Sequence, residues 1–387
     1  MVSFSVASVR DSLSGDKTGI VNFSDRYFFP TASQNCSIVS APISIFDAPA
    51  LEKLRRQRRL DPQYVRVLRN RLFKQFQPDE VSLAGFPARE QVRCHTLELY
   101  RRVDSAVDGA TKLLFRTAAG LLIESVVLRI ASGRTTLCVS SQVGCAAACE
   151  FCATGKMGIA RNLLPAEILD QVLQAGQLLA AEQSRLDNIV FMGMGEPFHN
   201  ETNLWETLDA LTAGDHFHRS PANILVSTVG VSDAMLRLAK RFPKVNLALS
   251  LHSVDQKTRE QIMPLARRYP LTELRRVLGQ CQQTQGREVM IEYLMLHKLN
   301  DAREQANHLV AWLGDLRAHV NLIPYNSIED APHLQASSPE KIAEFAGRLK
   351  AAGVKTTVRY SLGQDIAAAC GQLVRKENRL REPSHRL

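Results

Sequence analysis

The chain has 387 residues, of which 45% are hydrophobic and 22% charged, and its formal net charge is +9. This composition is that of a globular protein with a sizeable core, and the basic balance favours a polyanionic partner, with an unspecialised basic surface as the alternative. No apolar run is long enough for a transmembrane helix, and the N-terminus has neither a signal-peptide core nor the acid-poor composition of a transit peptide, so we expect a cytoplasmic protein without a membrane partner.

The first 107 residues divide into two parts. Residues 1–45 are rich in Ser and lack a sustained period, which predicts a poorly ordered extension. After it, Asp47 and Asp61 can each cap a helix whose first turn contains a proline. Between residues 52 and 77, nine basic residues stand against two acidic ones. A solvated helix surface is the ordinary explanation, but together with the whole-chain excess this run favours a basic, mainly helical accessory domain at 46–107 that contacts phosphate groups.

Residues 108–130 have the pattern of a β-hairpin. Two apolar strands, at about 112–116 and 121–128, flank a turn near Ala119 and Gly120. Glu124 interrupts the second strand. Periodicity alone predicts that this carboxylate points to solvent.

A cluster of cysteines follows the hairpin. Cys145, Cys149 and Cys152 have the spacing C-x3-C-x2-C, and Cys138 lies seven residues before the first of them. Three thiolates on one short loop can hold three irons of a [4Fe-4S] cluster and leave the fourth iron open for a substrate. Zinc is the alternative, but an ordinarily spaced fourth ligand is missing, and a disulfide framework does not suit a long chain without a secretion signal.

From residue 135 onward, short apolar strands alternate with amphipathic helices. We expect strands at about 135–140, 187–192, 224–228, 245–251, 288–296, 319–323 and 354–360, and helices between them, for example at 165–179, 233–240 and 339–350. Repeated βα units predict a parallel sheet or barrel that binds ligands at the C-terminal ends of its strands.

Several polar residues and glycines lie where these strands end. Each one alone has an ordinary explanation as a loop acid, a strand-end hydroxyl or a turn residue, but their shared position favours a ligand site. They are Gly195 and Glu196 after the second strand, Ser227 at the end of the third, Ser250, Leu251 and His252 at the fourth, and Asn326 after the sixth.

The remaining cysteines have less context. Cys370 lies among alanines, which is typical of a buried small side chain, although the glycines around it could carry it over the site. We interpret Cys36, Cys94 and Cys281 as structural. The chain is basic again after Cys370.

From about residue 108 to 374 the sequence resembles the RlmN/Cfr RNA methyltransferases, a branch of the radical S-adenosylmethionine (SAM) enzymes. Seven motifs in the family's order carry the resemblance: C-V-S-S-Q-V-G-C from Cys138, C-A-T-G-K-M-G-I-A-R-N-L from Cys152, M-G-M-G-E-P from Met192, L-S-L-H from Leu249, I-E-Y-L-M-L from Ile291, N-L-I-P-Y-N from Asn321 and D-I-A-A-A-C-G-Q-L from Asp365. The resemblance implies a partial (β/α)6 TIM-like radical SAM barrel at 131–365 and a C-terminal segment, 366–387, that carries Cys370.

The resemblance also implies a reaction. One SAM methylates Cys370, and a second SAM, bound on the cluster held by Cys145, Cys149 and Cys152, yields a 5'-deoxyadenosyl radical that takes hydrogen from the S-methyl group. The resulting radical adds to adenine, Glu124 accepts a proton, and Cys138 resolves the adduct by forming a disulfide with Cys370. The implied SAM contacts are Gly195, Glu196, Ser227, Ser250, Leu251, His252 and Asn326.

The implied substrate is an adenosine of 23S ribosomal RNA, methylated at C2, with transfer RNA as a further substrate. The implied partners are RNA and an electron donor such as flavodoxin, and we expect a monomer. Lys156 and Arg161, next to the cysteine cluster, are candidate RNA contacts.

The sequence departs from the family pattern at two places. Ser227-Thr-Val-Gly230 replaces S-T-S-G, and Leu362, Gln364 and Ala367 replace arginine and acidic residues before Cys370. Alternatives therefore stay open: C8 methylation of the Cfr type, which gives antibiotic resistance, a radical SAM enzyme that acts on protein, and a non-catalytic iron–sulfur protein that binds RNA.

Overall fold

The computed structural model describes residues 41–373. Most of the predicted N-terminal extension, Cys36 and the basic residues after Cys370 therefore lie outside the described residues. Residues 41–45, the end of the predicted extension, are described, and strand β1 (Ile43–Ser44) pairs in parallel with β2 (Val92–Arg93).

The two predicted N-terminal helices are confirmed. Helix α1 (Ala48–Gln57) begins after Asp47, whose side chain accepts a hydrogen bond from the Ala50 N–H at 2.9 Å. Helix α2 (Pro62–Arg69) begins after Asp61 and continues into a π-helical turn at Asn70–Lys74. This turn buries Phe73, which stacks on Phe217 with ring centroids 4.8 Å apart. A short helix, α3 (Asp79–Leu83), follows.

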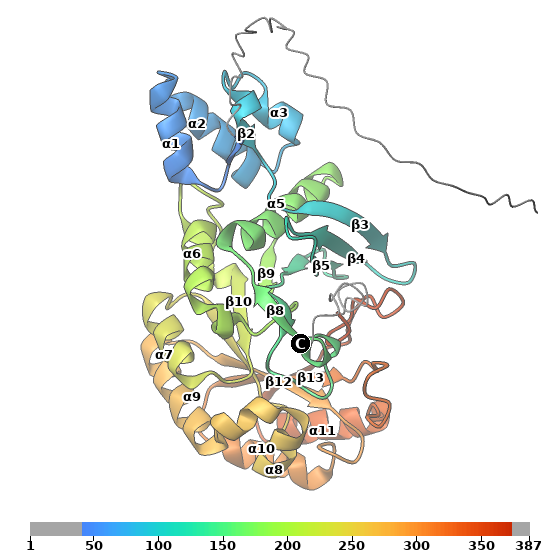
Figure 1. Ribbon diagram of the computed structural model, residues 1–387. Helices are drawn as coiled ribbons and strands as arrows, with labels where there is room; N and C mark the ends of the chain where they lie inside the picture. Colours follow the sequence, from blue (N-terminus) through green and yellow to red (C-terminus); the bar gives the residue numbers. More distant parts are fainter. Residues whose placement is uncertain (1–40, 374–387) are drawn as a thin grey trace, which may run out of the picture. The chain divides into compact units, whose positions relative to one another are not determined.

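A ten-stranded sheet forms the main part of the fold, in the order β14-β13-β12-β11-β10-β9-β6-β5-β4-β3 (Figure 1). Strands β6 and β9 to β14 pair in parallel, whereas β3, β4 and β5 pair antiparallel. The strands are β3 (Glu98–Asp104), β4 (Ala110–Arg116), β5 (Leu122–Arg129), β6 (Thr135–Cys138), β9 (Asn188–Phe191), β10 (Ile224–Thr228), β11 (Asn246–Ser250), β12 (Val289–Met295), β13 (Ala318–Pro324) and β14 (Lys355–Val358).

Helices connect the parallel strands, so the chain forms the predicted partial (β/α)6 TIM-like barrel. They are α5 (Pro165–Ala181), α6 (Glu201–Thr212), α7 (Ser232–Arg241), α9 (Leu271–Gln285), α10 (Arg303–Leu313) and α11 (Pro339–Ala351), with two short helices, α4 (Ala153–Lys156) and α8 (Gln256–Ile262). Within residues 41–373, none of these helices is both long and apolar enough to cross a membrane.

Helix α5 connects the N-terminal helices to the barrel. Its Gly176 faces the ring of Phe76, and a Cβ at this position would lie 2.2 Å from a ring carbon. Only glycine permits this close approach, because any side chain would displace the aromatic ring. Further along the same helix, Asp170 accepts hydrogen bonds from the N–H groups of Thr96 and Leu97 at 2.6 and 2.7 Å.

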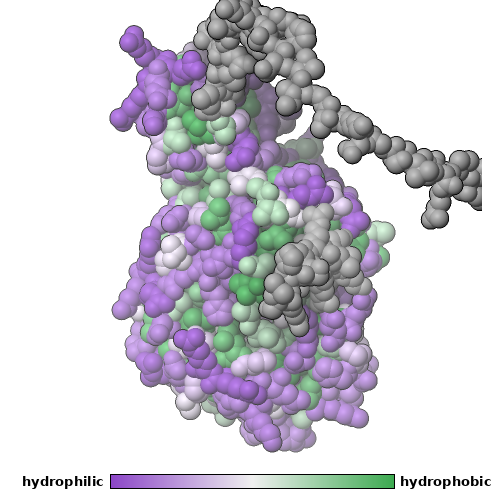
Figure 2. All heavy atoms as spheres, viewed as in Figure 1, coloured by the Kyte–Doolittle hydropathy of each residue, from purple (hydrophilic) through white to green (hydrophobic). Residues whose placement is uncertain are grey.

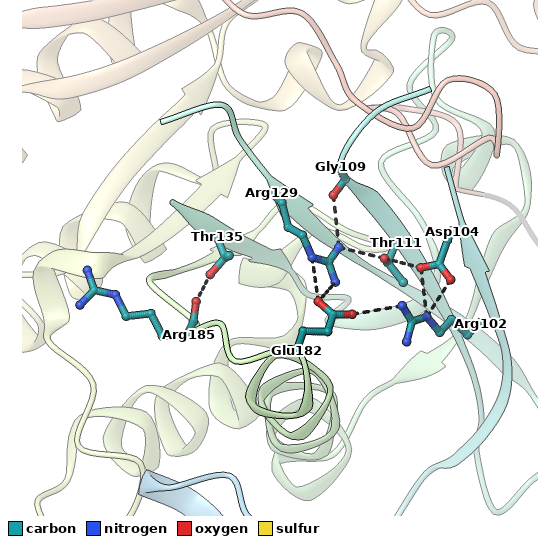
Figure 3. Close-up of polar contacts among 8 residues, drawn as sticks. All are labelled: Arg102, Asp104, Gly109, Thr111, Arg129, Thr135, Glu182 and Arg185. Carbon is teal, nitrogen blue, oxygen red and sulfur yellow. Dashed lines mark hydrogen bonds and ion pairs between the residues drawn. The ribbon is translucent and has the colours of Figure 1, made fainter. Parts of the chain in front are cut away.

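The C-terminal end of α5 is tied to the antiparallel strands by the polar network drawn in Figure 3. Glu182, just after the helix, accepts from Arg129 of β5 at 2.7 Å and from Arg102 of β3 at 3.1 Å. Arg129 also donates to Thr111 of β4 at 2.9 Å. Three strands are thus fixed against one helix end, which gives β5 and its Glu124 a defined place beside the barrel.

Strand β3 was not predicted. It lies in the range that we expected to be mainly helical, and its side chains are nearly all exposed. A strand without a buried face gives no alternation of polar and apolar residues, so the sequence carries no period-two signal there.

Candidate active site

The three cysteines of the C-x3-C-x2-C motif lie on a loop held by a small antiparallel hairpin, β7 (Gln142–Cys145) and β8 (Gly158–Asn162). Gly144 has a φ of 81°, and a Cβ there would lie 2.0 Å from the Gly158 carbonyl oxygen. Glycine is therefore required for the hairpin to close. Beyond it, the Ala147 N–H donates to the Cys145 sulfur at 3.4 Å.

Burial raises the pKa of the Cys145 thiol to about 12, and it raises the pKa of Cys149 and Cys152 as well. Cys152 adds to the pKa shifts of Cys145 and Cys149, and all three residues line the same cavity. A cationic group bound by these sulfurs would reverse the effect, because a metal-bound thiol is deprotonated. Among residues 41–373, no three His, Cys, Asp or Glu side chains surround a single metal-ion position, and a four-iron cluster does not need this, since each thiolate binds its own iron.

A cavity of about 170 Å³ lies beside this loop, at the C-terminal ends of the strands. It brings together most of the residues that the sequence analysis singled out there: Cys145, Cys149, Cys152, Gly195, Glu196, Ser227, Ser250, His252 and Cys370. Their shared location agrees with the predicted positions at the ends of parallel strands.

Glu196 is buried in this cavity. Its two carboxylate oxygens accept from the N–H groups of Phe198 and Val229 at 3.1 and 2.9 Å. Burial raises the pKa of Glu196 to about 7, although these backbone hydrogen bonds oppose the shift. Gly195, with a φ of 106°, allows the chain to approach Gln142 too closely for any Cβ.

His252 is a neutral side chain. Its Nδ1 accepts from the Leu294 N–H at 3.0 Å, and its ring contacts the Phe151 ring edge-on at 4.9 Å between centroids. Burial, with a smaller contribution from Arg259, lowers the pKa of His252 to about 3. The ring is therefore uncharged at neutral pH.

Two other predicted residues do not line this cavity. Leu251 is fully buried behind the strand end. Asn326 is also buried, and its Nδ2 donates to Ser361 Oγ at 3.0 Å and to the Cys370 carbonyl at 3.1 Å, while its Oδ1 accepts from Gln364 at 2.8 Å. Asn326 thus holds the Cys370 loop.

The Cys370 loop, residues 359–373, follows β14 at one edge of the sheet and reaches the β3–β4 turn at the other edge. Asp365 accepts from Ser105 Oγ at 2.8 Å, the Gly363 N–H donates to Asp108 at 2.8 Å, and Lys112 donates to the Ala367 carbonyl at 3.1 Å. On the cysteine-loop side, the Ala153 N–H donates to the Gly371 carbonyl at 2.8 Å. The loop therefore connects both edges of the open sheet and fixes Cys370 between them.

A second, larger cavity of about 460 Å³ lies on the other side of the Cys370 loop. Cys138 and Cys370 both line it, and three residues, Met192, Arg359 and Cys370, line both cavities. Burial raises the pKa of Cys138 to about 12, Cys370 raises it further, and Arg359 opposes the shift. Cys138, Cys370 and Arg359 therefore lie close enough for the charge of one to shift the pKa of another.

Arg359 and Glu292 are residues that the sequence analysis did not select as site residues. Glu292 is buried and Arg359 is half-buried, and both line the smaller cavity. Burial lowers the pKa of Arg359, but Cys370, Glu292 and Cys138 outweigh it and raise the pKa overall. Burial raises the pKa of Glu292, against the opposing charge of Arg359. A single carboxylate inside the apolar I-E-Y-L-M-L strand was the signal that could have identified Glu292.

The prediction from periodicity that Glu124 points to solvent is wrong. Glu124 is fully buried, and Lys112 Nζ lies 3.8 Å from its Oε1. The reason is that both faces of β5 are covered, since successive side chains from Leu122 to Val127 are all buried.

The two candidate RNA contacts beside the cysteine loop have partners within the protein. Lys156 pairs with Glu150 at 2.5 Å, and Arg161 forms a two-pronged pair with Glu167 at 2.6 and 2.8 Å. Away from the cavities, Figure 2 shows hydrophilic residues over α1 and α2. There, the Arg56 side chain remains 74% exposed although it pairs with Glu52, so its guanidinium group is accessible to a polyanionic partner.

A parallel (β/α) barrel with a three-cysteine loop after its first parallel strand, beside a cavity at the strand ends, defines a radical SAM enzyme. Residues 139–310 match the model of the Radical SAM superfamily. A radical SAM methyltransferase structure from Sphaerobacter thermophilus superposes with a TM-score of 0.81 and 37% identity, covering 86% of this chain and 99% of that one.

Two curated relatives make the assignment more specific. A protein of Rhodopirellula baltica named as a probable RNA methyltransferase is 63% identical over 88% of this chain and 90% of its own length. The dual-specificity RNA methyltransferase RlmN of Desulfotalea psychrophila is 42% identical over 71% of this chain and 77% of its own length. The chain belongs to the RlmN-like family of radical SAM RNA methyltransferases.

Proposed function

We propose that this enzyme transfers a methyl group from SAM, by way of an S-methyl group on Cys370, to C2 of an adenosine in 23S ribosomal RNA, and that transfer RNA is a further substrate. The observation that supports this most directly is the place of Cys370. It lines the cavity beside the three-cysteine loop and also the cavity that contains Cys138. The Cys370 side chain can therefore reach both the cavity where the radical would form and Cys138, which would resolve the covalent adduct.

Cys145, Cys149 and Cys152 would hold a [4Fe-4S] cluster, and the clustering of their buried sulfurs fits this role. When bound, the cluster together with SAM supplies a 5'-deoxyadenosyl radical. Of the proposed SAM ligands, Gly195, Glu196, Ser227, Ser250 and His252 line the same cavity.

Within this set, Glu196 suits the methionyl ammonium group, because each of its oxygens has a lone pair beyond the one that accepts a backbone N–H. Leu251 and Asn326 stay in the proposed set through the family resemblance. Asn326 would have to exchange one of its present partners to reach SAM.

The remaining steps belong to three side chains. Cys370 carries the methyl group and becomes bonded to the adenine ring through its methylene carbon. Glu124, buried near Lys112, accepts the proton lost from the ring. The excess electron of the radical adduct would return to the redox partner that supplied it. Cys138, once deprotonated, then attacks the Cys370 sulfur: the sulfur–methylene bond breaks, a Cys138–Cys370 disulfide forms, and the methylene carbon takes up a proton to become the methyl group of the released base. The protonation of the buried Cys138 thiol, indicated by its raised pKa, keeps it from reacting earlier.

The basic helices α1 and α2 support an RNA-binding role for residues 46–107, since exposed arginines bind phosphate groups without reading sequence. Residues 131–365 would then form the catalytic core, and 366–387 the segment that carries Cys370. A flavodoxin-like electron donor, a monomeric state and a cytoplasmic location stay predictions from the sequence.

The test is anaerobic reconstitution with iron, sulfide, SAM, reductant and protein-free ribosomal RNA, followed by mass spectrometry of the digested nucleosides. We expect 2-methyladenosine, whereas 8-methyladenosine would assign the enzyme to Cfr-type chemistry. Cys370→Ala should retain SAM cleavage and abolish methyl transfer, and Cys281→Ala, a buried cysteine outside both cavities, should retain both. RNA methylation by Cys370→Ala would disprove the mechanism.

A further inference from the structure

The larger cavity gives a second approach to the Cys138–Cys370 pair. We propose that it admits a low-molecular-weight thiol, which reduces the Cys138–Cys370 disulfide from the N-terminal ends of the barrel strands. This inference rests on the proposed function, because that reaction is what forms the disulfide.

The first argument is the position of the two cysteines. Cys138 lies on β6 and lines the larger cavity but not the smaller one, whereas Cys370 lines both. The side of the disulfide that contains Cys138 therefore faces away from the proposed cluster and SAM site. A reductant in the larger cavity would reach it without passing the residues proposed to bind SAM.

The second argument is the extent of the cavity. It runs from the Cys370 loop along the inner wall of the barrel, where Cys138, Val190 and Leu225 line it. It ends among residues at the starts of the parallel strands, opposite the strand ends that carry the smaller cavity. These residues include the polar Asn188, Asn223 and Glu288, of which Asn223 and Glu288 are exposed. The cavity therefore reaches solvent at a polar mouth.

The size of the cavity selects the kind of reductant. A volume of about 460 Å³ is that of a small-molecule pocket and leaves no room for a folded protein. Cys138 and Cys370 are both only partly exposed. A small thiol with a polar group, which can rest at the asparagine-lined mouth while its sulfur reaches inward, fits this shape.

The exchange is balanced with two thiols. The thiolate of the first attacks the Cys138 sulfur, the Cys138–Cys370 bond breaks, and Cys370 leaves as a thiolate that then takes up a proton. The second thiolate attacks the outer sulfur of the mixed disulfide and releases Cys138, which is protonated in turn. Two small thiols become one disulfide, and both cysteines return to the thiol form. Arg359, which lines both cavities beside Cys370, supplies a positive charge that stabilises the departing thiolate.

The test uses the full chain with its cluster, oxidised anaerobically with diamide to form the disulfide. Reduction by 2-mercaptoethanol is followed by quenching with iodoacetamide and by mass spectrometry of the cysteine peptides. Asn223→Trp, which fills the mouth, should slow reduction by about tenfold. Asn307→Trp, on the exposed face of α10 and outside the cavity, should reduce at the wild-type rate.

A second measurement needs no variant: the same thiol attached to a long polyethylene glycol chain should reduce the wild-type disulfide much more slowly than free 2-mercaptoethanol. Equal rates for the free and attached thiols, or for Asn223→Trp and the wild type, would overturn the proposal. A single-turnover reaction with RNA distinguishes a failure of the proposed route of reduction from a failure of the proposed function. If methylated RNA appears without a Cys138–Cys370 disulfide, the resolving role of Cys138 is wrong, whatever the route of reduction.

Discussion

Asn326 tests two roles against each other, because the sequence predicts a SAM ligand and the structure places the side chain against the Cys370 loop. Replacing it with alanine removes three hydrogen bonds, to Ser361, to the Cys370 carbonyl and from Gln364. Ser361 and Gln364 are accessible enough for water to replace their bonds, so the main loss is the bond to the Cys370 carbonyl. We expect the substitution to destabilise the loop conformation that places Cys370 by about 2 kcal/mol, which should slow methyl transfer roughly thirtyfold.

The assay measures two products of the same enzyme sample. Transfer of the methyl group from pre-methylated Cys370 to RNA should fall, while formation of 5'-deoxyadenosine from SAM should change little. Gln372→Ala is the control, because it removes a single exposed hydrogen bond of the same loop, from Gln372 to the Ser327 carbonyl at 3.2 Å. An equal fall in both products for Asn326→Ala would refute the loop-holding role and favour direct binding of SAM.

Two further predictions concern stability and assembly. His95 lies between Asp170 at 2.8 Å and Asp79 at 3.0 Å; burial lowers its pKa, but the two carboxylates outweigh it and raise the pKa to about 10. The contribution of His95 to the free energy of unfolding should therefore be complete below pH 6.5 and be lost as the pH rises through 10. Urea unfolding should show that His95→Asn is clearly less stable than the wild type at pH 6 and only slightly less stable at pH 10.5. An equal difference in stability at both pH values would contradict this prediction. Gly144→Ala should prevent closure of the β7–β8 hairpin and abolish iron incorporation. The control is Gly133→Ala, because Gly133 has the same φ of 81° but no atom lies within 4 Å of the added Cβ. This control should lower the free energy of unfolding by only about 1–2 kcal/mol and retain iron, and iron analysis of both variants checks the prediction.

The sequence predicted the barrel well because its strands are short apolar runs separated by amphipathic helices. Strand β10, for example, was predicted at 224–228 and lies at Ile224–Thr228. The caps at Asp47 and Asp61 were equally local signals. Strand β3 was missed because its exposed side chains give no alternation, and its place depends on pairing with β4.

The site was predicted less completely, because contacts between distant segments decide it. Glu124 is buried because both faces of β5 are covered in the fold, which the residues around Glu124 do not encode. Arg359 and Glu292 were not among the predicted site residues, yet both line the smaller cavity together with Cys370. The roles of Cys138 and Cys370 came from family resemblance, since each alone resembles an ordinary buried cysteine.

The anchoring of the Cys370 loop bears on how its sequence can drift. Four of the anchors act on main-chain atoms of the loop: the Gly363 N–H and the carbonyls of Ala367, Cys370 and Gly371. Four others use its side chains, those of Ser361, Gln364, Asp365 and Gln372. Main-chain groups are the same in every residue except proline, so the side chains at 362 and 367 can change without loss of these anchors, whereas a change at 364 removes the hydrogen bond from its side chain to Asn326. Two of the three departures from the family pattern, Leu362 and Ala367, lie at these tolerant positions, and selection for a different RNA surface could act on them while Cys370 keeps its place.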